Sequence, residues 1–160
     1  MNNPEFWQRF TAQYGETVTH HFREALEQPP QVSIRLNPRK STASIGESVP
    51  WCSTGRCLAE RPAFTFDPLF HAGAYYVQEA GSMFLEQAIR QYGIDAHTAL
   101  DLCAAPGGKS TLMRSLLADD CLLVSNEPLP KRTQVLAENM AKWGHPQSIV
   151  TQNYPKDFAR

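Results

Sequence analysis

Three short apolar segments, separated by two helical patterns, constrain the fold of this 160-residue chain more than any other feature. The apolar segments are residues 98–102, 121–127 and 148–152, which read TALDL, CLLVSNE and SIVTQ. Residues 108–120 and 130–143 lie between them and have apolar residues at helical spacing. An order of strand, helix, strand, helix, strand predicts an α/β fold with a buried parallel sheet, because parallel strands need long crossover connections.

The chain begins with a less regular region. Asn3 and Pro4 are a good start for a helix, in which Trp7 and Phe10 form an apolar stripe that we expect to be the core of an N-terminal helical layer. A second helix is predicted over residues 16–27, since the prolines that follow it cannot continue a helix.

Strand signals follow these helices. Residues 32–37, VSIRLN, alternate apolar and polar side chains and predict a strand. Shorter strand candidates lie among proline, serine and glycine, such as CLAE at residues 57–60 and AFTF at residues 63–66. Residues 79–93 then predict a helix that ends at Gly93. We therefore expect an accessory α/β domain over residues 1–68 and the first half of a Rossmann-like domain over residues 69–160.

Composition narrows the functional classes. Fifteen lysines and arginines against 16 acidic residues give a formal charge of −1, so net charge does not favour a nucleic-acid partner. We find no run long enough to span a membrane and no signal peptide. The four cysteines have no C-x-x-C spacing and no clustered histidines beside them, so we expect no metal and a reduced, cytoplasmic protein.

The turn between the first apolar segment and its helix, LDLCAAPGGKST at residues 100–111, allows three interpretations. A nucleotide P-loop would use Gly108, Lys109 and Ser110, but Cys103 stands where its first glycine belongs. A nucleoside-cofactor turn needs an acidic residue at the end of the next strand, and Glu127 lies there. Because G-x-G-x-x-G is absent, a cofactor without a pyrophosphate, such as S-adenosylmethionine, fits that interpretation. The third possibility is an ordinary strand-to-helix turn.

The segment DLCAAPGGKST closely resembles the cofactor motif of the Sun-type (Nol/Nop/Sun) RNA cytosine-5 methyltransferases, particularly the bacterial ribosomal-RNA members. The resemblance extends upstream to FHAGAYYVQEAGSMF and to SIRLNPRK, which is similar to the R-x-N element of that family. Downstream it continues through SNEPLPKRTQVLAENMAKWG and so covers most of the chain.

This resemblance implies that S-adenosylmethionine is the cofactor and that the turn holds its methionine and ribose. Glu127 would accept the ribose hydroxyls, and Arg132 matches a basic position near the cofactor. The family has an aspartate for the adenine where Tyr154 stands here, so Asn153 is the expected substitute. The turn residues assigned to the cofactor are Cys103, Ala104, Ala105, Pro106, Gly107, Gly108 and Lys109.

For the RNA, the local basic cluster of Arg35, Arg39 and Lys40 predicts phosphate contacts. Ribosomal RNA is favoured over transfer RNA as the partner. Gln78, Glu79, Tyr75 and Tyr76 precede the turn and are candidates either for the site or for simple structural roles.

The two catalytic cysteines of the family lie in later motifs, so we assign no catalytic residue here and expect a fragment that binds without catalysing. Cys103 and Cys121 are expected to be small packing residues, and Cys52 and Cys57 incidental loop residues. Two alternatives remain at this stage, a P-loop nucleotide-binding protein and a non-catalytic RNA-binding module.

Overall fold

The computed structural model describes residues 3–41, 43, 45–93 and 95–159. The chain divides into two compact units, Met1–Gln31 and Val32–Arg160. The sequence predicts a division at residue 68 instead. That division would separate two strands that pair with each other in one sheet. No helix in the described ranges is long and apolar enough to cross a membrane.

The first unit is a pair of helices, α1 (Pro4–Tyr14) and α2 (Glu16–Glu27). The side chain of Asn3 accepts the N–H of Phe6, as the capping pattern predicts. The stripe on α1 packs on α2, because the Phe10 and Phe22 rings stack with centroids 4.9 Å apart. The helix over residues 16–27 is confirmed.

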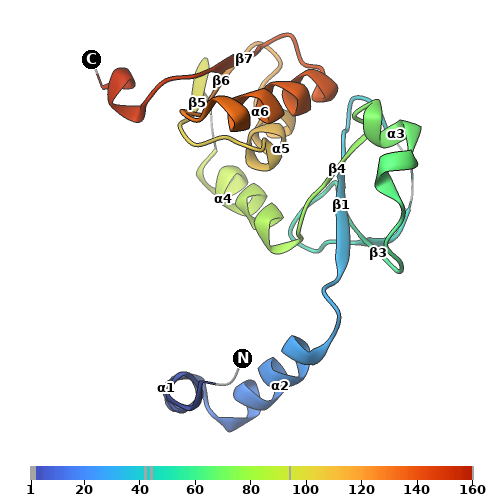
Figure 1. Ribbon diagram of the computed structural model, residues 1–160, viewed down its shortest axis with the longest axis vertical. Coiled ribbons are helices and arrows are strands. Elements are labelled where there is room, and N and C mark those ends of the chain that lie inside the picture. The colour runs from blue at the N-terminus through green and yellow to red at the C-terminus, as the bar shows by residue number, and fades with distance from the viewer. Residues whose placement is uncertain (1–2, 42, 44, 94, 160) are drawn as a thin grey trace. The chain divides into compact units, whose positions relative to one another are not determined.

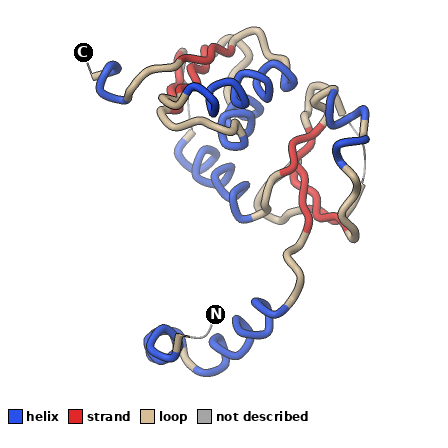
Figure 2. The backbone as a smooth tube through the Cα atoms, viewed as in Figure 1, coloured by secondary structure: helices blue, strands red, loops and turns tan. Residues whose placement is uncertain are grey.

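The second unit contains a small antiparallel sheet with the strand order β2-β3-β1-β4. Figure 1 labels β1, β3 and β4 of this sheet, and Figure 2 draws its strands in red. Its strands are β1 (Val32–Leu36), β2 (Glu47–Ser48), β3 (Gly55–Leu58) and β4 (Tyr75–Val77). The strand predicted over residues 32–37 is confirmed as β1. Strand β4 lies beyond residue 68 yet pairs with β1, Leu36 facing Tyr75.

Of the two short strand candidates, residues 57–60 and residues 63–66, only the first contains strand residues. Cys57 and Leu58 belong to β3, but residues 64–66 form a 3-10 turn (Phe64–Phe66), followed by α3 (Pro68–His71). The strand prediction for AFTF was wrong because Phe64 is buried against Phe70 and Tyr75 while Phe66 is 86% exposed. A tight turn places these two rings on opposite sides without any partner strand.

The rest of the unit has the predicted strand and helix order. A 3-10 turn (Gly81–Phe84) leads into α4 (Leu85–Tyr92), and three parallel strands follow in the order β5-β6-β7. Their bounds, with those of the crossover helices, are β5 (Thr98–Asp101), α5 (Gly108–Leu116), β6 (Leu122–Asn126), α6 (Pro130–Trp143) and β7 (Ser148–Thr151). A final 3-10 turn covers Pro155–Phe158.

The parallel sheet has one packed face and one exposed face. Leu123 of β6 is fully buried in a core cluster with Leu136 of α6. The opposite face carries the in-register row Leu100, Val124 and Ile149, and the two outer residues are 42% and 47% exposed. The expectation that residues 98–102 form a buried strand is therefore wrong, because Thr98, Leu100 and Leu102 are exposed and the two residues between them are only half-buried.

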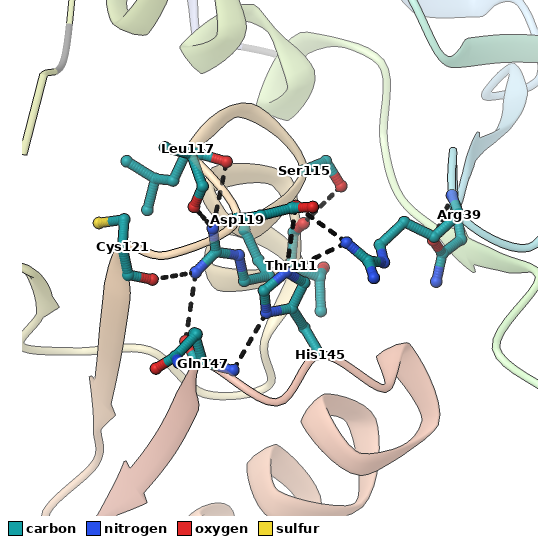
Figure 3. Close-up of polar contacts among 11 residues, drawn as sticks. Arg39, Thr111, Ser115, Leu117, Asp119, Cys121, His145 and Gln147 are labelled. Atoms are coloured by element: carbon teal, nitrogen blue, oxygen red, sulfur yellow. Dashed lines mark hydrogen bonds and ion pairs between the residues drawn. The ribbon is translucent and has the colours of Figure 1, made fainter. Parts of the chain in front are cut away.

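A buried arginine joins the end of α5 to the strands. Arg114 is 3% exposed and donates to the carbonyls of Leu117 and Ala118 at the end of α5. It also donates to Cys121 and Gln147, which precede β6 and β7 (Figure 3 labels three of these acceptors). Backbone carbonyls at the end of α5 and before β6 and β7 are therefore the hydrogen-bond acceptors of this positive charge.

Candidate functional site

The turn between β5 and α5 is shaped by its own backbone. Gly107 has φ +111°, a left-handed conformation that favours glycine, and its N–H donates to the Ala104 carbonyl at 2.8 Å. The Ala104 N–H donates to Asn126 at the end of β6, and the Cys103 N–H donates to the Asp101 carboxylate. Three of the turn's amides are thus engaged within the protein.

The turn residues differ in what they present to solvent. Ala104 and Ala105 are buried in the core cluster of the parallel sheet, and Gly107 is buried too. Cys103, Pro106 and Lys109 are exposed. Side-chain contact with a bound group from this turn would therefore come from the three exposed residues.

Glu127 lies where the sequence predicts an acidic residue, directly after β6. Its side chain is 2% exposed, and one carboxylate oxygen accepts the Leu129 N–H at 3.2 Å. The other carboxylate oxygen is 3.6 Å from the Arg132 guanidinium, which also donates to the Ala105 carbonyl at 2.9 Å. Arg132 therefore ties the acidic residue to the glycine turn, and the structure brings all three predicted elements together.

Asn126 is a central residue of this edge that the sequence interpretation missed. Its amide donates to the carbonyls of Leu102 and Asn153, which follow β5 and β7. Its side-chain oxygen accepts the Thr151 hydroxyl and the Asn153 N–H. One buried side chain thus holds the carboxyl ends of all three strands, and a polar residue at the end of an apolar strand was the available signal.

Asp101 was also missed. One of its oxygens accepts the Cys103 N–H at 3.2 Å and the other accepts the Ser110 hydroxyl at 2.7 Å. The carboxylate therefore fastens the start of the turn to the first turn of α5. Its position at the end of β5 was visible in the sequence.

Asn153 and Tyr154 follow β7. Both side chains are exposed, and the backbone of Asn153 is held by Asn126 as described. The Tyr154 N–H donates to Asp157, which fixes the 3-10 turn that follows. Asn153 is therefore brought to the same edge as the turn, and its role toward a cofactor stays a prediction.

The prediction that Arg35 contacts an RNA phosphate is wrong. Its side chain is completely buried, since β1 directs it toward the start of α5. Its guanidinium donates to the Thr111 hydroxyl at 2.5 Å and to the Gly108 carbonyl at 3.2 Å. Thr111 in turn donates to the Gly107 carbonyl. The arginine thus supports the predicted cofactor turn from inside the protein.

The surroundings of Arg35 are polar but contain no paired carboxylate among the described residues. Its Nε donates to Gln78 at 2.9 Å, and its guanidinium lies 4.6 Å from the Trp143 ring centroid. Burial lowers the pKa of Arg35 to about 10. Gln78, a candidate for the site, is therefore a buried partner of the arginine.

Asn37 explains the other half of the R-x-N element. It is 1% exposed, and its amide donates to the carbonyls of Gly73 and Trp143, each at 3.0 Å. These carbonyls belong to the loop before β4 and to the end of α6. The side chain therefore joins the small antiparallel sheet to the helix that packs on the parallel one.

The remaining candidates before the turn have local roles. Tyr75 is buried and donates to Asp67 at 2.6 Å, whereas the half-buried Tyr76 donates to the Pro106 carbonyl of the turn. Exposed Glu79 accepts the backbone N–H groups of Gly81 and Ser82 at the start of the following 3-10 turn. Tyr76 alone among these three residues has a bond to the cofactor turn.

Two members of the basic cluster are exposed, as expected. Arg39 forms an ion pair of 2.9 Å with Asp119, which also lies 3.5 Å from His145 (Figure 3). Lys40 donates to the carbonyl of Ala72, directly after α3, and to the carbonyl of Lys142, at the end of α6. Both side chains stay candidates for RNA contact.

The cysteines depart from expectation in three cases. Cys103, expected to be a packing residue, is exposed. Cys52 lies in the loop between β2 and β3, as expected, but it is buried there, and burial raises the pKa of its thiol. Cys57 lies on β3 and not in a loop. Cys121 is buried, as expected. Within the described ranges, no three histidine, cysteine or acidic side chains gather as a metal site would require.

Comparison with known proteins places this geometry in a family. Residues 3–80 match the family described as the N-terminal domain of 16S rRNA methyltransferase RsmF, and residues 93–158 match 16S rRNA methyltransferase RsmB/F. Ribosomal RNA small subunit methyltransferase F of Aliivibrio fischeri (strain MJ11) is 32% identical over 155 residues, covering 84% of this chain and 33% of that protein. The Shewanella sp. (strain ANA-3) protein of the same name is 32% identical over 143 residues, covering 81% of the chain and 30% of its own length.

Solved structures share the fold. A methyltransferase homolog from Pyrococcus horikoshii superposes with a TM-score of 0.74 at 25% identity, covering 91% of this chain and 51% of that one. NSun6 from Pyrococcus horikoshii, solved with SFG, has a TM-score of 0.75 at 13% identity, covering 98% of this chain and 67% of that one. The chain spans about a third of the length of the curated relatives named above. On these matches, the chain belongs to the RsmF-like 16S rRNA methyltransferases, within the Sun-type family that its sequence resembles.

Proposed function

We propose that this chain is the cofactor-binding part of an S-adenosylmethionine-dependent methyltransferase that modifies carbon 5 of a cytosine in ribosomal RNA. The observation that carries the proposal is the Glu127–Arg132–Ala105 connection, which holds a carboxylate beside a small-residue turn at the carboxyl ends of parallel strands. Open parallel sheets bind ligands at that edge. The family supports ribosomal RNA as the substrate, and we infer a cytoplasmic protein.

The residues present fit S-adenosylmethionine. A buried carboxylate can accept hydrogen bonds from the two hydroxyls of a ribose, and Glu127 supplies such a carboxylate at the end of β6. The turn reaches solvent through Cys103, Pro106 and Lys109, with no bulky side chain among its other members. S-adenosylmethionine, when bound, supplies the methyl group.

The roles of the protein groups follow from their contacts. Glu127 would accept hydrogen bonds from the ribose, and Arg132 would hold that carboxylate in place through its bond to Ala105. Asn126 fixes the edge on which both rest. Asn153 follows the third strand and is our candidate for the adenine, because Tyr154 occupies the position where the family has an aspartate.

No cysteine described here is assigned as the nucleophile. Attack on carbon 6 of cytosine requires a thiolate, and burial disfavours one at Cys52 by raising its pKa. Cys121 is buried directly before β6, at the amino end of that strand, whereas the turn lies at the carboxyl ends of the strands. Exposed Cys103 belongs to the cofactor turn. We therefore assign binding, and not covalent catalysis, to this part of the protein.

A P-loop function is the weaker alternative. A P-loop directs successive backbone N–H groups at a phosphate, but those of Cys103, Ala104 and Gly107 have partners within the protein. The Ser110 hydroxyl, which would face Mg²⁺ in a P-loop, donates to Asp101. This arrangement supports a cofactor without phosphates.

Calorimetric titration with S-adenosylmethionine tests the proposal, with ATP and Mg²⁺ in a parallel titration. We expect S-adenosylmethionine to bind, and Glu127→Ala to weaken it by about tenfold or more, since removing a charged hydrogen-bond acceptor costs about 1.5–3 kcal/mol. Glu138→Ala, an exposed substitution on α6, is the matched control. Binding of ATP alone would favour the P-loop, and RNA binding without cofactor binding would favour a non-catalytic module.

A further inference from the structure

A small aromatic pocket lies next to the predicted cofactor turn. It has a volume of about 140 Å³ and lies between the loop before β4, β4 itself and α6. The residues that matter for its chemistry are Phe70, Tyr76, Val77, Asn139, Lys142 and Trp143. Pockets for drug-sized ligands are several times larger, so this one has room for about one planar ring.

The pocket adjoins the predicted cofactor site through direct hydrogen bonds. Tyr76 donates to the Pro106 carbonyl at 3.3 Å, and Asn139 donates to the same oxygen at 2.8 Å. Both side chains therefore line the pocket and also hold the cofactor turn. Trp143, on a third wall, stacks on Arg35, which supports that turn from behind.

The pocket walls are fixed in place by the protein. Asn37 donates to the carbonyls of Gly73 and Trp143, two residues that line the pocket. Gly73 has φ +68°, and a Cβ there would overlap the Lys142 carbonyl, so the loop lies directly against α6. A cavity held this way exists before any ligand binds, which reduces the ordering cost of binding.

Two ammonium groups, those of Lys142 and Lys40, lie at the C-terminal end of α6. Lys142 lines the pocket with its Nζ 5.6 Å from the Phe70 ring centroid, and Lys40 donates to the Lys142 carbonyl. Neither lysine has an ion pair with a carboxylate in the described part of the chain. Their charge is thus available to an anionic partner, and Lys40 belongs to the basic cluster that the sequence points out.

We propose that this pocket takes one unpaired RNA base, with Lys142 and Lys40 contacting the phosphates that flank it. Aromatic walls with cations at the rim are the means by which proteins hold single-stranded nucleic acid, because every base offers a face for stacking. A protein side chain without a negative charge would use the ring walls but would leave the two ammonium groups without an ionic partner. The inference rests on the proposed function, since it takes RNA to be the substrate.

Fluorescence anisotropy with a labelled single-stranded RNA of about eight nucleotides tests the pocket, with the same backbone carrying abasic sites as the second probe. We expect Phe70→Leu to weaken binding of the intact RNA about tenfold and to leave the abasic RNA unchanged, as stacking on one ring predicts. Lys142→Gln should weaken both probes and reduce the salt dependence by about one phosphate contact.

Matched controls are Phe66→Leu, an 86% exposed ring outside the pocket, and Lys131→Gln, an exposed lysine on the same helix. Each variant is checked by circular dichroism and by titration with S-adenosylmethionine. Equal binding of intact and abasic RNA, no RNA binding at all, or an unchanged affinity in Phe70→Leu would overturn the pocket. Binding of N-acetylphenylalaninamide that Phe70→Leu abolishes, without an effect on RNA, would show that the pocket serves a protein side chain instead.

The two proposals fail in different ways. If S-adenosylmethionine binds and the Phe70 variant behaves like the wild type toward RNA, the pocket assignment falls and the proposed function stands. If the pocket binds RNA and S-adenosylmethionine does not bind, the cofactor assignment falls.

Discussion

The two sheets of the second unit are built on different principles. In the parallel sheet, apolar strands and amphipathic helices pack through residues such as Leu123 and Leu136. In the small antiparallel sheet, β1 contributes fully buried Arg35 and is followed by fully buried Asn37, and the bonds of these side chains reach α5 and α6. The first sheet carries the candidate site, and the second supports it through polar contacts across the boundary between them.

The comparison explains where sequence reasoning succeeds. The helix over residues 130–143 agrees with α6 at both ends, because Pro130 begins it and Gly144 follows in a left-handed conformation. Strands β6 and β7 are short segments with an apolar centre, each preceded by such a helix. Regular periodicity and strong end signals were sufficient to predict this half.

The small sheet was harder for physical reasons. Its strand β2 has two residues, and β4 has three, so neither shows a readable alternation. Arg35 looks like a surface charge in sequence, and only the three-dimensional fold brings Thr111 and Gln78 to it. Sequence reasoning located Glu127 and Arg132 but could not foresee which polar residues would be buried between the sheets.

Gly73→Ala should produce the largest loss and shows how rigid the junction is. Gly73 has φ +68°, and a Cβ would meet the backbone of α6. Because both strain and a backbone collision result, we expect a loss of about 3 kcal/mol in the free energy of unfolding. Urea denaturation measures it, with Gly93→Ala, also at positive φ but in open space, losing about 1 kcal/mol. Equal losses would mean that the loop and α6 separate easily.

Arg35→Met tests the polar support of the turn. The substitution leaves the Gln78 side-chain oxygen without its Arg35 donor while removing a buried charge, and these effects partly cancel. We expect a net loss of about 2 kcal/mol, together with weaker binding of S-adenosylmethionine. Arg39→Met removes only an exposed ion pair and should cost below about 1 kcal/mol. A result in which the two arginines behave alike would contradict the assigned role.

His145→Gln should have the smallest effect, visible only in the pH dependence. Burial, with Arg114 nearby, lowers the pKa of His145, which accepts the Gln147 N–H. The unfolded chain therefore takes up a proton more readily, and stability should fall as the pH drops through the ordinary histidine pKa of 6.5. The variant should lose that part of the pH dependence in urea titrations at several pH values. Exposed His97→Gln is the control, and a stability that rises on acidification would refute the sign.

Hydrogen exchange followed by mass spectrometry, with and without S-adenosylmethionine, tests the central claim most directly. The account predicts slower exchange in peptides that cover residues 102–110 and 127–132, where the turn, Glu127 and Arg132 lie together. It also predicts no such protection in the Glu127→Ala variant. Protection confined to other segments, or none at ligand concentrations that saturate the calorimetric signal, would contradict the assignment of this turn as the cofactor site.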